Sequence, residues 1–440
     1  MTTYWCEWAW LPQGPQPGVR FEVERGRITA VAVDVPAGGA EQLPGMVLPG
    51  LANAHSHAFH RALRGWHTGA RGTFWTWREQ MYQVAAALEP DSYYRLARGV
   101  YAEMALAGIT CVGEFHYLHH AAGGTRYADA NAMGEALAQA ARDVGIRLTL
   151  LDTCYLAGGF GRELEGVQLR FSDGDAAGWM SRVDEFTVDE RIRLGAAVHS
   201  VRAVPDAAIP EVTGWARGRP LHVHLSEQRA ENEACLAAHG CTPTQLLESH
   251  GALGPDTTAV HATHLSAGDV ALLGGSGTGV CLCLTTEADL ADGIGPAPAL
   301  RVAGSRLSIG SDGHSVIDPF AEVQAIESYQ RLATETRGHF AAGELLDAAA
   351  EAGHRSLGWT DAGRLEVGAR ADFVAIDLGS TRLAGAAPEA VPAVARADDV
   401  REVIADGERI VHDRAHRAVD AARELRDAIA DLRVLGARTS

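Results

Sequence analysis

Two histidines one residue apart, His55 and His57, give the first indication of chemistry in this sequence. They end a short apolar run, and alternate residues of a β-strand point to the same face of a sheet. Both imidazoles can therefore reach a single metal ion. Because isolated His-x-His pairs are common in proteins that bind no metal, this interpretation requires further ligands elsewhere in the chain.

Two more residues, His224 and Asp312, could complete the ligand set. Each lies at the end of a separate apolar run, PLHVHLSE and RLSIGSD. Three imidazoles and one carboxylate suit zinc, with iron as the alternative, and leave a position for water. We therefore expect one ion per chain, bound by His55, His57, His224 and Asp312. His222 is the local competitor of His224 but lies further from the strand end.

Glu227 and His261 could handle protons beside that ion. Glu227 follows His224 closely, where it could receive a proton from bound water and pass it to a leaving nitrogen. His261 ends the next apolar run and could orient the water, with His264 as the alternative. Asp312 could share the removal of the proton.

Eight short apolar or β-branched runs supply these residues: MVLPGLANAHSH, ITCVGEFHY, IRLTLLDTCY, RLGAAVHSV, PLHVHLSE, TTAVHATHL, GVCLCLTT and RLSIGSD. Segments of helical period lie between them, most clearly after Asp91, which could cap a helix that Gly108 ends. Strands that alternate with helices predict a parallel sheet. Eight such units predict the α/β class and a (β/α)₈ barrel of the TIM type.

Polar side chains gather at the carboxyl ends of these predicted strands: His55, His57, Glu114, His116, Asp152, His199, His224, His261, Thr285 and Asp312. In such barrels this rim carries the catalytic groups. Glu114 could bridge a second metal ion. Because the chain has no lysine to supply a bridging carbamate, we expect Glu114 to orient its neighbours instead.

The two ends of the chain differ from the middle. Residues 1–48 and 362–415 alternate like antiparallel strands, and we expect them to form one small β-sandwich. Residues 49–361 then form the metal-dependent barrel. Residues 416–440 have helical period, and we expect this C-terminal helix to pack outside the barrel with its charges in solvent.

The composition limits the partners of the protein. The 440 residues include 38 basic and 56 acidic side chains, a net charge of −18. This balance argues against binding to nucleic acid or to an anionic membrane, so any anionic ligand needs local arginines. The absence of lysine excludes a lysine Schiff base and a P-loop.

The seven cysteines are scattered and include no C-x-x-C pair, which predicts reduced thiols and a cytoplasmic location. Cys281 and Cys283 share one face of a predicted strand, and their apolar neighbours favour core packing. No leader peptide or membrane span is expected from the sequence. A homodimer is the default expectation for the oligomeric state.

The order of the motifs resembles a known superfamily. The strings LPGLANAHSHAFHRALRG, HVHLSEQ, AVHATHL, TTEADLADGI and GSDGH are similar to those of the amidohydrolases, which are metal-dependent barrels. Within that superfamily, FWTWREQMY, GEFHYLHH and AVHSVR resemble the formimidoylglutamate deiminase family of histidine degradation. The match covers essentially the whole barrel, and the last three motifs are the more selective.

The resemblance implies hydrolytic deimination of N-formimino-L-glutamate to N-formyl-L-glutamate and ammonia. It implies zinc held by the four ligands above, with Glu227 and His261 as the proton-handling pair. The residues expected to hold the small-molecule substrate are His60, Arg78, Tyr117, His199 and Arg202. Guanidinium groups suit this task because they bind carboxylates in a bidentate manner.

Two positions depart from the family pattern. His60 stands where the family often has Gln, and Gly313 stands where it often has Ser. The substrate contact at His60 is therefore the weakest inference from the resemblance, since an imidazole differs from an amide in geometry and charge.

Two other functions remain open at this point. A deaminase of nucleobases or other heterocycles would need aromatic stacking, for which Trp66, Trp75 and Trp77 are available. A non-catalytic barrel scaffold is the alternative from a different class, although such proteins are expected to lose the metal ligands. The small-residue loop around residues 65–72 could close over the ligand.

Overall fold

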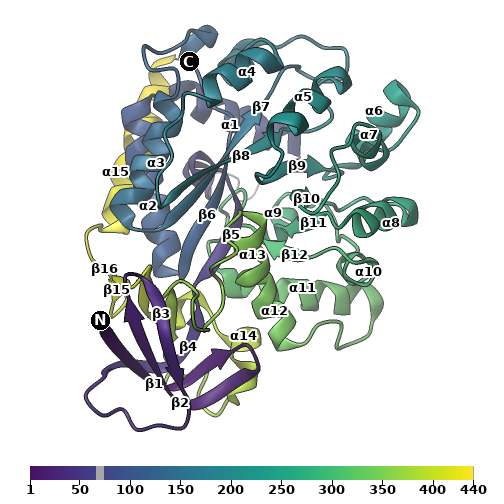
Figure 1. The fold of residues 1–440 in the computed structure, drawn as a ribbon. Helices are drawn as coiled ribbons and strands as arrows, with labels where there is room; N and C mark the ends of the chain where they lie inside the picture. The colour runs from purple at the N-terminus through teal and green to yellow at the C-terminus, as the bar shows by residue number, and fades with distance from the viewer. Residues whose placement is uncertain (66–73, 440) are drawn as a thin grey trace.

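The computed structural model describes the backbone of residues 1–65 and 74–439, and the side chains of residues 1–65 and 76–433 (Figure 1). The loop expected to close over the ligand lies almost wholly outside the described residues, as do Trp66 and the side chain of Trp75.

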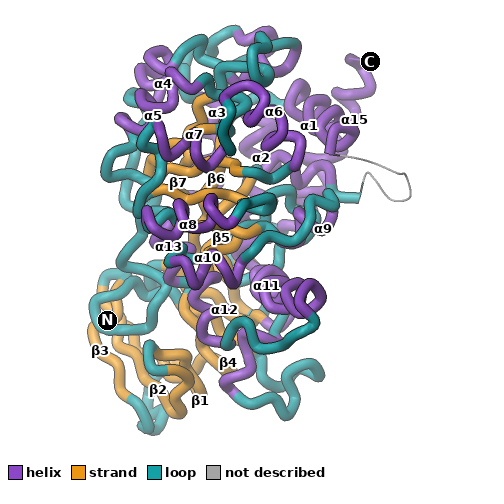
Figure 2. The backbone as a smooth tube through the Cα atoms, turned by 90° about the vertical axis from the view of Figure 1, so that its right-hand side faces the viewer, coloured by secondary structure: helices purple, strands orange, loops and turns teal. Residues whose placement is uncertain are grey.

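The centre of the molecule is a barrel of eight described parallel strands that follow one another in chain order around the sheet (Figure 2). They are β5 (Leu51–Ser56), β6 (Ile109–His116), β7 (Arg147–Cys154), β8 (Ile192–Val198), β9 (Leu221–Leu225), β10 (Thr257–His261), β11 (Gly279–Leu282) and β12 (Leu307–Ile309). A parallel bridge between Ser56 and Asp312 brings the first and last strands together. The predicted (β/α)₈ barrel is therefore confirmed.

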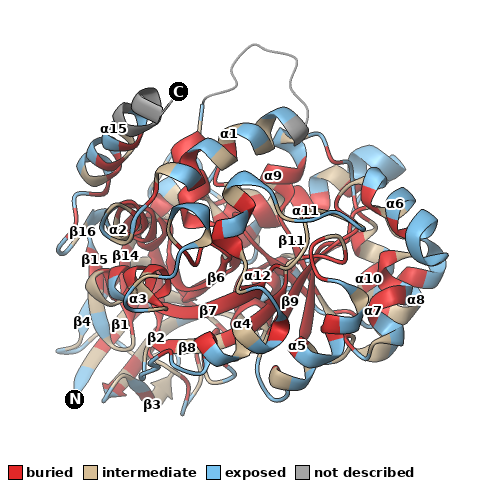
Figure 3. Cartoon of the chain, turned by 90° about the horizontal axis from the view of Figure 1, so that it is seen from above, coloured by how far each residue is buried: buried red, intermediate tan, exposed pale blue. Residues whose placement is uncertain are grey.

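Helices cover the outside of the barrel: α1 (Phe74–Ala87), α2 (Pro90–Leu106), α3 (Ala132–Val144), α4 (Ala176–Val183), α5 (Ile209–Trp215), α6 (Arg229–His239), α7 (Pro243–Ser249), α8 (Ala267–Ser276), α9 (Leu284–Asp289), α10 (Ala297–Ala303), α11 (Pro319–Thr334), α12 (Ala342–Ala349) and α13 (Glu351–Ser356). Seen from above, the strands are buried and the outer helix faces are exposed (Figure 3). This division follows from the apolar stripe that each helix presents to the sheet.

Two expected elements differ from their sequence prediction. The run MVLPGLANAHSH contains the end of one strand and the start of another, because Gly50 separates Pro49 from Leu51. A side chain at Gly50 would collide with Thr110 and Asp372. Only glycine therefore fits at the point where the chain passes from one sheet to the other. Thr285 lies in helix α9 rather than at a strand end.

The ends of the chain share a second sheet, as expected. Its order is β16-β15-β14-β13-β4-β1-β2-β3, which is one mixed sheet rather than two separate layers. The strands are β1 (Thr2–Leu11), β2 (Gly14–Glu24), β3 (Arg27–Ala32), β4 (Glu41–Pro49), β13 (Phe373–Ile376), β14 (Val400–Ala405), β15 (Glu408–His412) and β16 (Ala415–His416). It has a hydrophobic core of its own, in which the Phe373 ring lies 5.0 Å from Phe21 and 5.6 Å from Tyr4. The exact domain boundaries stay a prediction.

An ionic network joins this sheet to the amino-terminal end of the barrel. Arg147, at the start of β7, pairs with Asp372 and lies 2.9 Å from Asp406. The guanidinium groups of Arg147, Arg193 and Arg370 lie over the Trp359 ring, at 5.3, 4.0 and 4.9 Å from its centre. A buried arginine of this kind is tolerated because its charge is fully paired.

The C-terminal helix α15 (Ala421–Thr439) packs on the outside of the barrel, as predicted. It lies against α2, where Arg98 pairs with Glu424 at 2.7 Å, and it also contacts α1. Helix α2 begins at Pro90, two residues earlier than a helix capped by Asp91 would, so Glu89 rather than Asp91 is its cap. Among the described residues, none of the helices is both long and apolar enough to cross a lipid bilayer. The last short helix, α14 (Val391–Val394), lies near α11 and α12.

Candidate active site

Asp312 brings the predicted metal ligands together at the carboxyl end of the barrel. Its Oδ1 atom lies 3.3 Å from Nε2 of both His55 and His57. The Nε2 atoms of His55 and His224 are 3.1 Å apart. The candidate ligand atoms fall in two groups that share Asp312: one contains His55, His224 and His261, and the other contains His57 and His60. Within each group these atoms lie within 4.8 Å of one another.

Backbone carbonyls fix the orientation of two of these rings. His57 Nδ1 lies 3.0 Å from the carbonyl oxygen of Phe115, and His224 Nδ1 lies 2.9 Å from that of His199. Each Nδ1–H donates to its carbonyl, so the Nε2 lone pair faces the centre of the cluster. Burial lowers the pKa of His57 and His224 well below the ordinary value, which keeps both rings neutral. These are the conditions under which imidazole binds a metal.

Close packing places His55 against the last strand. A side chain at Gly310 would come within 2.7 Å of the Cβ atom of His55, so only glycine lets the two strands approach this closely. Burial lowers the pKa of His55, and its hydrogen bond to Asp312 partly opposes that effect. The same contact holds the pKa of Asp312 below its ordinary range although burial alone would raise it.

Glu227 and His261 lie beside these ligands. His261 Nε2 is 3.9 Å from Glu227 Oε1 and 3.9 Å from Asp312 Oδ2. Burial raises the pKa of Glu227. Burial opposes the charged form of His261, but the carboxylates of Glu227, Glu287 and Asp312 outweigh it and raise the pKa of that ring well above its usual value.

The backbone is strained where these side chains leave their strands. Ser226, His261 and Asp312 have φ angles of +50°, +67° and +41°, in the left-handed region that non-glycine residues rarely adopt. Strain of this kind persists where the surrounding structure holds a residue in one required position. At the carboxyl ends of β9, β10 and β12 the backbone is thus held in one position beside the candidate ligands.

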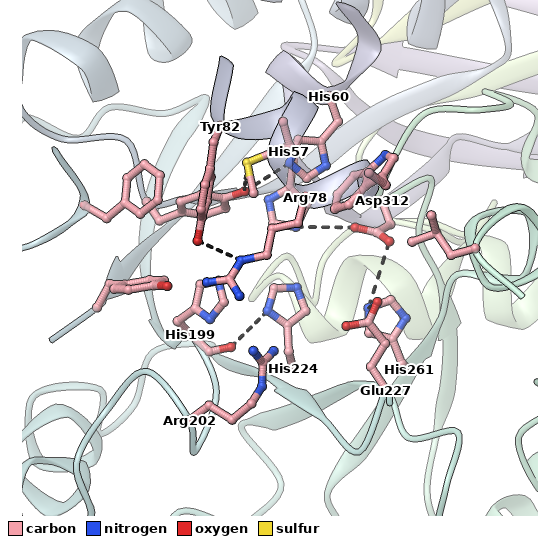
Figure 4. Close-up of a pocket in the computed structure, with 16 residues that line it drawn as sticks. His57, His60, Arg78, Tyr82, His199, Arg202, His224, Glu227, His261 and Asp312 are labelled. Atoms are coloured by element: carbon pink, nitrogen blue, oxygen red, sulfur yellow. Dashed lines mark hydrogen bonds and ion pairs between the residues drawn. The ribbon is translucent and has the colours of Figure 1, made fainter. Parts of the chain in front are cut away.

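A cavity opens beside the cluster (Figure 4). All of the residues predicted to hold substrate line it: His60, Arg78, Tyr117, His199 and Arg202. His57, His224, Glu227, His261 and Asp312 line it as well. The structure therefore places the predicted proton-handling and substrate-holding side chains around one space, while His55 lies fully buried beneath it.

The two arginines reach the cavity from different elements. Arg78, on α1, donates from Nε to the hydroxyl of Tyr82 at 2.7 Å. Arg202, which follows β8, donates from Nε to Glu231 at 3.0 Å. Figure 4 shows both guanidinium groups near His199, at the end of the cavity away from Asp312. A cationic wall thus faces the carboxylates of the cluster across the cavity.

The departure at His60 is accommodated by a hydrogen bond. His60 Nε2 lies 3.0 Å from the hydroxyl of Tyr117, and Trp77 packs edge-on against the ring at 5.0 Å. Burial lowers the pKa of His60 to about 3, so the ring is neutral. Gly313, the second departure, donates its N–H to the Thr286 hydroxyl at 3.0 Å.

Several lining residues were not predicted. Tyr82 and Tyr155 line the cavity, and the amide of Gln168, which is not among the lining residues, donates to both phenols, at 3.1 and 3.2 Å. Met81, Phe171 and Leu290 complete the apolar part. Tyr82 was within reach of sequence reasoning, because residues four apart on a helix share a face and Arg78 precedes it by four. Nothing local in the sequence indicates Gln168.

The structure distinguishes the alternatives left open by the sequence. His222 donates its Nε2–H to the backbone carbonyl of Ser356 at 3.0 Å, and neither it nor His264 lines the cavity. Glu114 accepts from the Ser56 hydroxyl and the Ala58 amide, both at 2.6 Å, so it ties the chain on either side of His57. Cys281 and Cys283 are buried in a small apolar cluster.

A second group of buried histidines and an aspartate lies at the ends of β6 and β7: His116, His119 and Asp152. Both oxygens of Asp152 are occupied by Arg182, at 2.9 and 2.7 Å, and the Trp179 indole donates to Oδ1 at 2.9 Å. A guanidinium already neutralises this carboxylate, so the group does not fit a second cation.

This fold and site define the class of protein. A profile of the amidohydrolase family matches residues 46–410, and the chain belongs to that family, whose members depend on a metal ion. A crystal structure of an amidohydrolase from Brucella melitensis has 34% sequence identity and a TM-score of 0.90, covering 98% of this chain and all of that one (100%).

Two relatives narrow the comparison. The formimidoylglutamate deiminase of Pseudomonas aeruginosa is 38% identical over 456 aligned positions, covering 99% of each chain. This confirms the resemblance to that family noted in the sequence. A 5-methylthioadenosine/S-adenosylhomocysteine deaminase of Haloarcula marismortui is 30% identical over 403 positions, covering 89% of this chain and 88% of its own.

Proposed function

We propose that this protein hydrolyses N-formimino-L-glutamate to N-formyl-L-glutamate and ammonia, as the name of its Pseudomonas relative indicates for that enzyme. One observation carries the proposal. The cavity has a metal-type cluster with a proton-handling pair at one end, and the guanidinium groups of Arg78 and Arg202 at the other. A dianionic substrate with a reactive amidine at one end matches both.

The donor set fits a bound divalent cation. Neutral imidazoles with their Nε2 atoms 3.1 Å apart, next to a carboxylate of depressed pKa, form a stable arrangement when a cation lies among them. We assign His55, His57, His224 and Asp312 as its ligands, with zinc as the ion and one ion per chain. When bound, such an ion lowers the pKa of a coordinated water from 15.7 to about 7.

The residues around it then move protons. Glu227 accepts one proton from the attacking water as its oxygen bonds to the carbon of the formimino group, which is bound as the amidinium, and donates that proton to the terminal nitrogen. Asp312 accepts the remaining proton from the hydroxyl of the adduct as the carbon–nitrogen bond breaks, so the carbonyl of N-formylglutamate forms, ammonia leaves with the bonding electron pair, and Asp312 returns its proton to solvent. His261 donates a hydrogen bond to the developing adduct from Nε2, which already faces Glu227 and Asp312.

The other side of the cavity holds the glutamate portion. Arg78 and Arg202 bind its carboxylates, and their positive charge is needed because the chain as a whole carries −18. Tyr117 and His199 donate hydrogen bonds to the same portion, and His60 fixes the Tyr117 hydroxyl from behind. A productive geometry therefore requires both ends of the substrate to be bound together.

The test is ammonia release from purified protein supplied with zinc and formiminoglutamate. We expect one ammonia and one N-formylglutamate per substrate consumed, the latter identified by mass. Formamide and glutamate would show that the other carbon–nitrogen bond breaks, and would contradict the proposal. Adenosine, 5-methylthioadenosine, guanine and cytosine should give no release above background.

A heterocycle deaminase is the second candidate, since the Haloarcula relative is named a 5-methylthioadenosine/S-adenosylhomocysteine deaminase. The cavity favours formiminoglutamate because two of its lining side chains, Arg78 and Arg202, are guanidiniums suited to a pair of carboxylates, which a neutral heterocycle does not have. The scaffold alternative conflicts with the convergence of the ligand atoms. A homodimer and a cytoplasmic location stay predictions, the first checked by light scattering on the purified protein and the second by fractionation of the source cells.

A further inference from the structure

The buried carboxylate of Glu287 lies behind His261. Its Oε1 atom is 3.3 Å from His261 Nδ1, while Nε2 of the same ring faces Glu227 and Asp312. Glu287 is not among the residues that line the cavity, and it is only 1% exposed. Its contact with the site therefore runs through the imidazole.

The junction between β11 and α9 holds Glu287 in place. Its Oε1 accepts the backbone N–H of Cys283 at 2.9 Å, and its own N–H donates to the carbonyl of Cys283 at 2.9 Å. Oε2 is buried with no hydrogen-bond partner among the described residues. The backbone thus fixes the carboxylate, whose side-chain partner among the described residues is His261.

The three oriented rings of the site differ in what holds their Nδ1 atoms. Neutral backbone carbonyls hold His57 and His224, whereas a carboxylate holds His261. A carbonyl fixes a ring but leaves it neutral, which suits a metal ligand. A carboxylate also stabilises the protonated ring, which suits a hydrogen-bond donor. The choice of partner matches the role that each ring is given in the proposed reaction.

We propose that Glu287 is a positioning residue that fixes His261 with its Nε2–H directed at Glu227 and at the reacting group. The inference rests on the proposed function for the role of His261. Without Glu287, the imidazole can rotate about its Cβ–Cγ bond and withdraw this donor, and nothing in the substrate-holding end of the cavity changes. Loss of Glu287 should therefore lower turnover without weakening substrate binding.

Two substitutions test this, Glu287→Leu and Glu287→Gln. The leucine removes the acceptor, and we expect kcat to fall by about 10- to 100-fold, as for other residues that orient a catalytic histidine. KM and zinc content should stay close to those of the unmodified enzyme. The glutamine retains an oxygen that can accept from both His261 and Cys283, so we expect a smaller fall in kcat.

The chain offers a matched control at Glu322. This glutamate on α11 is also 1% exposed, and it holds the same helix α9 through the amide of Thr285 at 3.1 Å and through its hydroxyl. It is not an assigned partner of His261. Glu322→Gln should leave kcat unchanged. Equal losses in the Glu287 and Glu322 variants would show general loosening of α9 and would overturn the proposal.

A readout independent of turnover keeps this inference separate from the proposed function. In ¹⁵N spectra of histidine-labelled protein, the Nδ1–H signal of His261, assigned by its substitution, should lose in Glu287→Leu the downfield proton shift that a hydrogen bond to a carboxylate produces. This shift is expected even if formiminoglutamate is not the substrate. Unchanged ring signals together with unchanged kcat would show that Glu287 only packs. If the leucine variant does not fold, the same spectra of Glu287→Gln decide.

Discussion

Two buried clusters at the carboxyl end of the barrel contain the same residue types but differ in what completes them. In the Asp312 cluster (His55, His57, His224 and Asp312), histidine Nε2 atoms and a carboxylate face one another. In the Asp152 cluster (His116, His119, Asp152 and Arg182), a guanidinium fills the corresponding place. The comparison shows that histidines and an aspartate in proximity do not make a metal site. The proposed metal site is the cluster whose carboxylate contacts histidines and, among the described residues, no guanidinium.

Arg182 pairs with a second carboxylate besides Asp152, which explains how its guanidinium group can be buried. Arg182 Nε lies 3.0 Å from Asp173, and that carboxylate is 2.9 Å from His120. Arg182 therefore pairs with two carboxylates, Asp152 and Asp173, inside the protein. Only the Asp312 cluster borders the cavity. We therefore expect the Asp152 cluster to contribute to stability and the Asp312 cluster to contribute to the proposed function, although both lie in one barrel.

Asp312→Asn should have the largest effect. The amide preserves the shape but removes the only negative charge among the ligands, so we expect metal content to fall from about one equivalent per chain toward zero and turnover to vanish. Elemental analysis and the ammonia assay measure both. A variant that retains a full equivalent of metal and normal activity would place the ion elsewhere.

Glu227→Gln should separate metal binding from chemistry. The amide cannot accept the proton of water, so we expect kcat to fall by about 10²- to 10⁴-fold. The zinc content should stay unchanged because Glu227 is not an assigned ligand. Near-normal turnover of formiminoglutamate by this variant would refute the proton route.

Arg78→Met should weaken binding of the anionic substrate. Loss of one hydrogen-bonded charge costs about 1.5–3 kcal/mol, so we expect kcat/KM to fall by about 10- to 100-fold, mainly through KM. The exposed Arg217 offers a control, and Arg217→Met should leave both constants unchanged. If the two variants behave alike, the arginine wall of the cavity has no part in recognition.

Arg182→Met probes the other cluster and should leave turnover per folded molecule and metal content as they were. The substitution leaves the buried carboxylates of Asp152 and Asp173 without their guanidinium partner. Removal of one partner of a buried ion pair lowers the free energy of unfolding by about 3–5 kcal/mol. Urea denaturation monitored by tryptophan fluorescence measures this loss. Loss of zinc in this variant would mean that the clusters are not independent.

The same variant predicts an effect of pH on stability. Burial alone would raise the pKa of Asp152, but Arg182 holds this pKa below its usual value. This group therefore stabilises the folded state above about pH 4 and loses that contribution as the pH falls through its folded pKa. Without Arg182, burial raises the pKa, and stability is lost instead as the pH rises above about 4. The difference in unfolding free energy should thus be widest at pH 7 and narrow toward pH 4; a constant difference would contradict the assignment.

Much of this arrangement was predictable from local pattern. Periodicity of two placed His55 and His57 on one face, and alternation of strands with helices gave the barrel. Position along the strand favoured His224 over His222, but the pattern could not show what orients the two rings, since those contacts are to the carbonyls of Ser356 and His199, elsewhere in the chain. Thr285 was misplaced because an apolar run does not reveal where a buried strand yields to a helix.

The contacts that separate the two clusters were also beyond the sequence. Asp152 and Arg182 are 30 residues apart, and only the folded chain shows that one neutralises the other. The same holds for Glu287, which lay in a quoted motif, TTEADLADGI, without any sign that it would meet His261. Contacts between two side chains that are distant in the chain produce no periodic pattern in the sequence.

Helix α15 contacts both α1 and α2, and α1 carries Arg78 and Tyr82 into the cavity. The far end of the chain thus braces the wall that recognises substrate, although it is distant from the metal ligands in sequence. Proteolytic trimming of this helix should first show as a rise in KM, before any fall in melting temperature. An enzyme preparation nicked at its tail would then look intact in a stability assay and yet need more substrate to work.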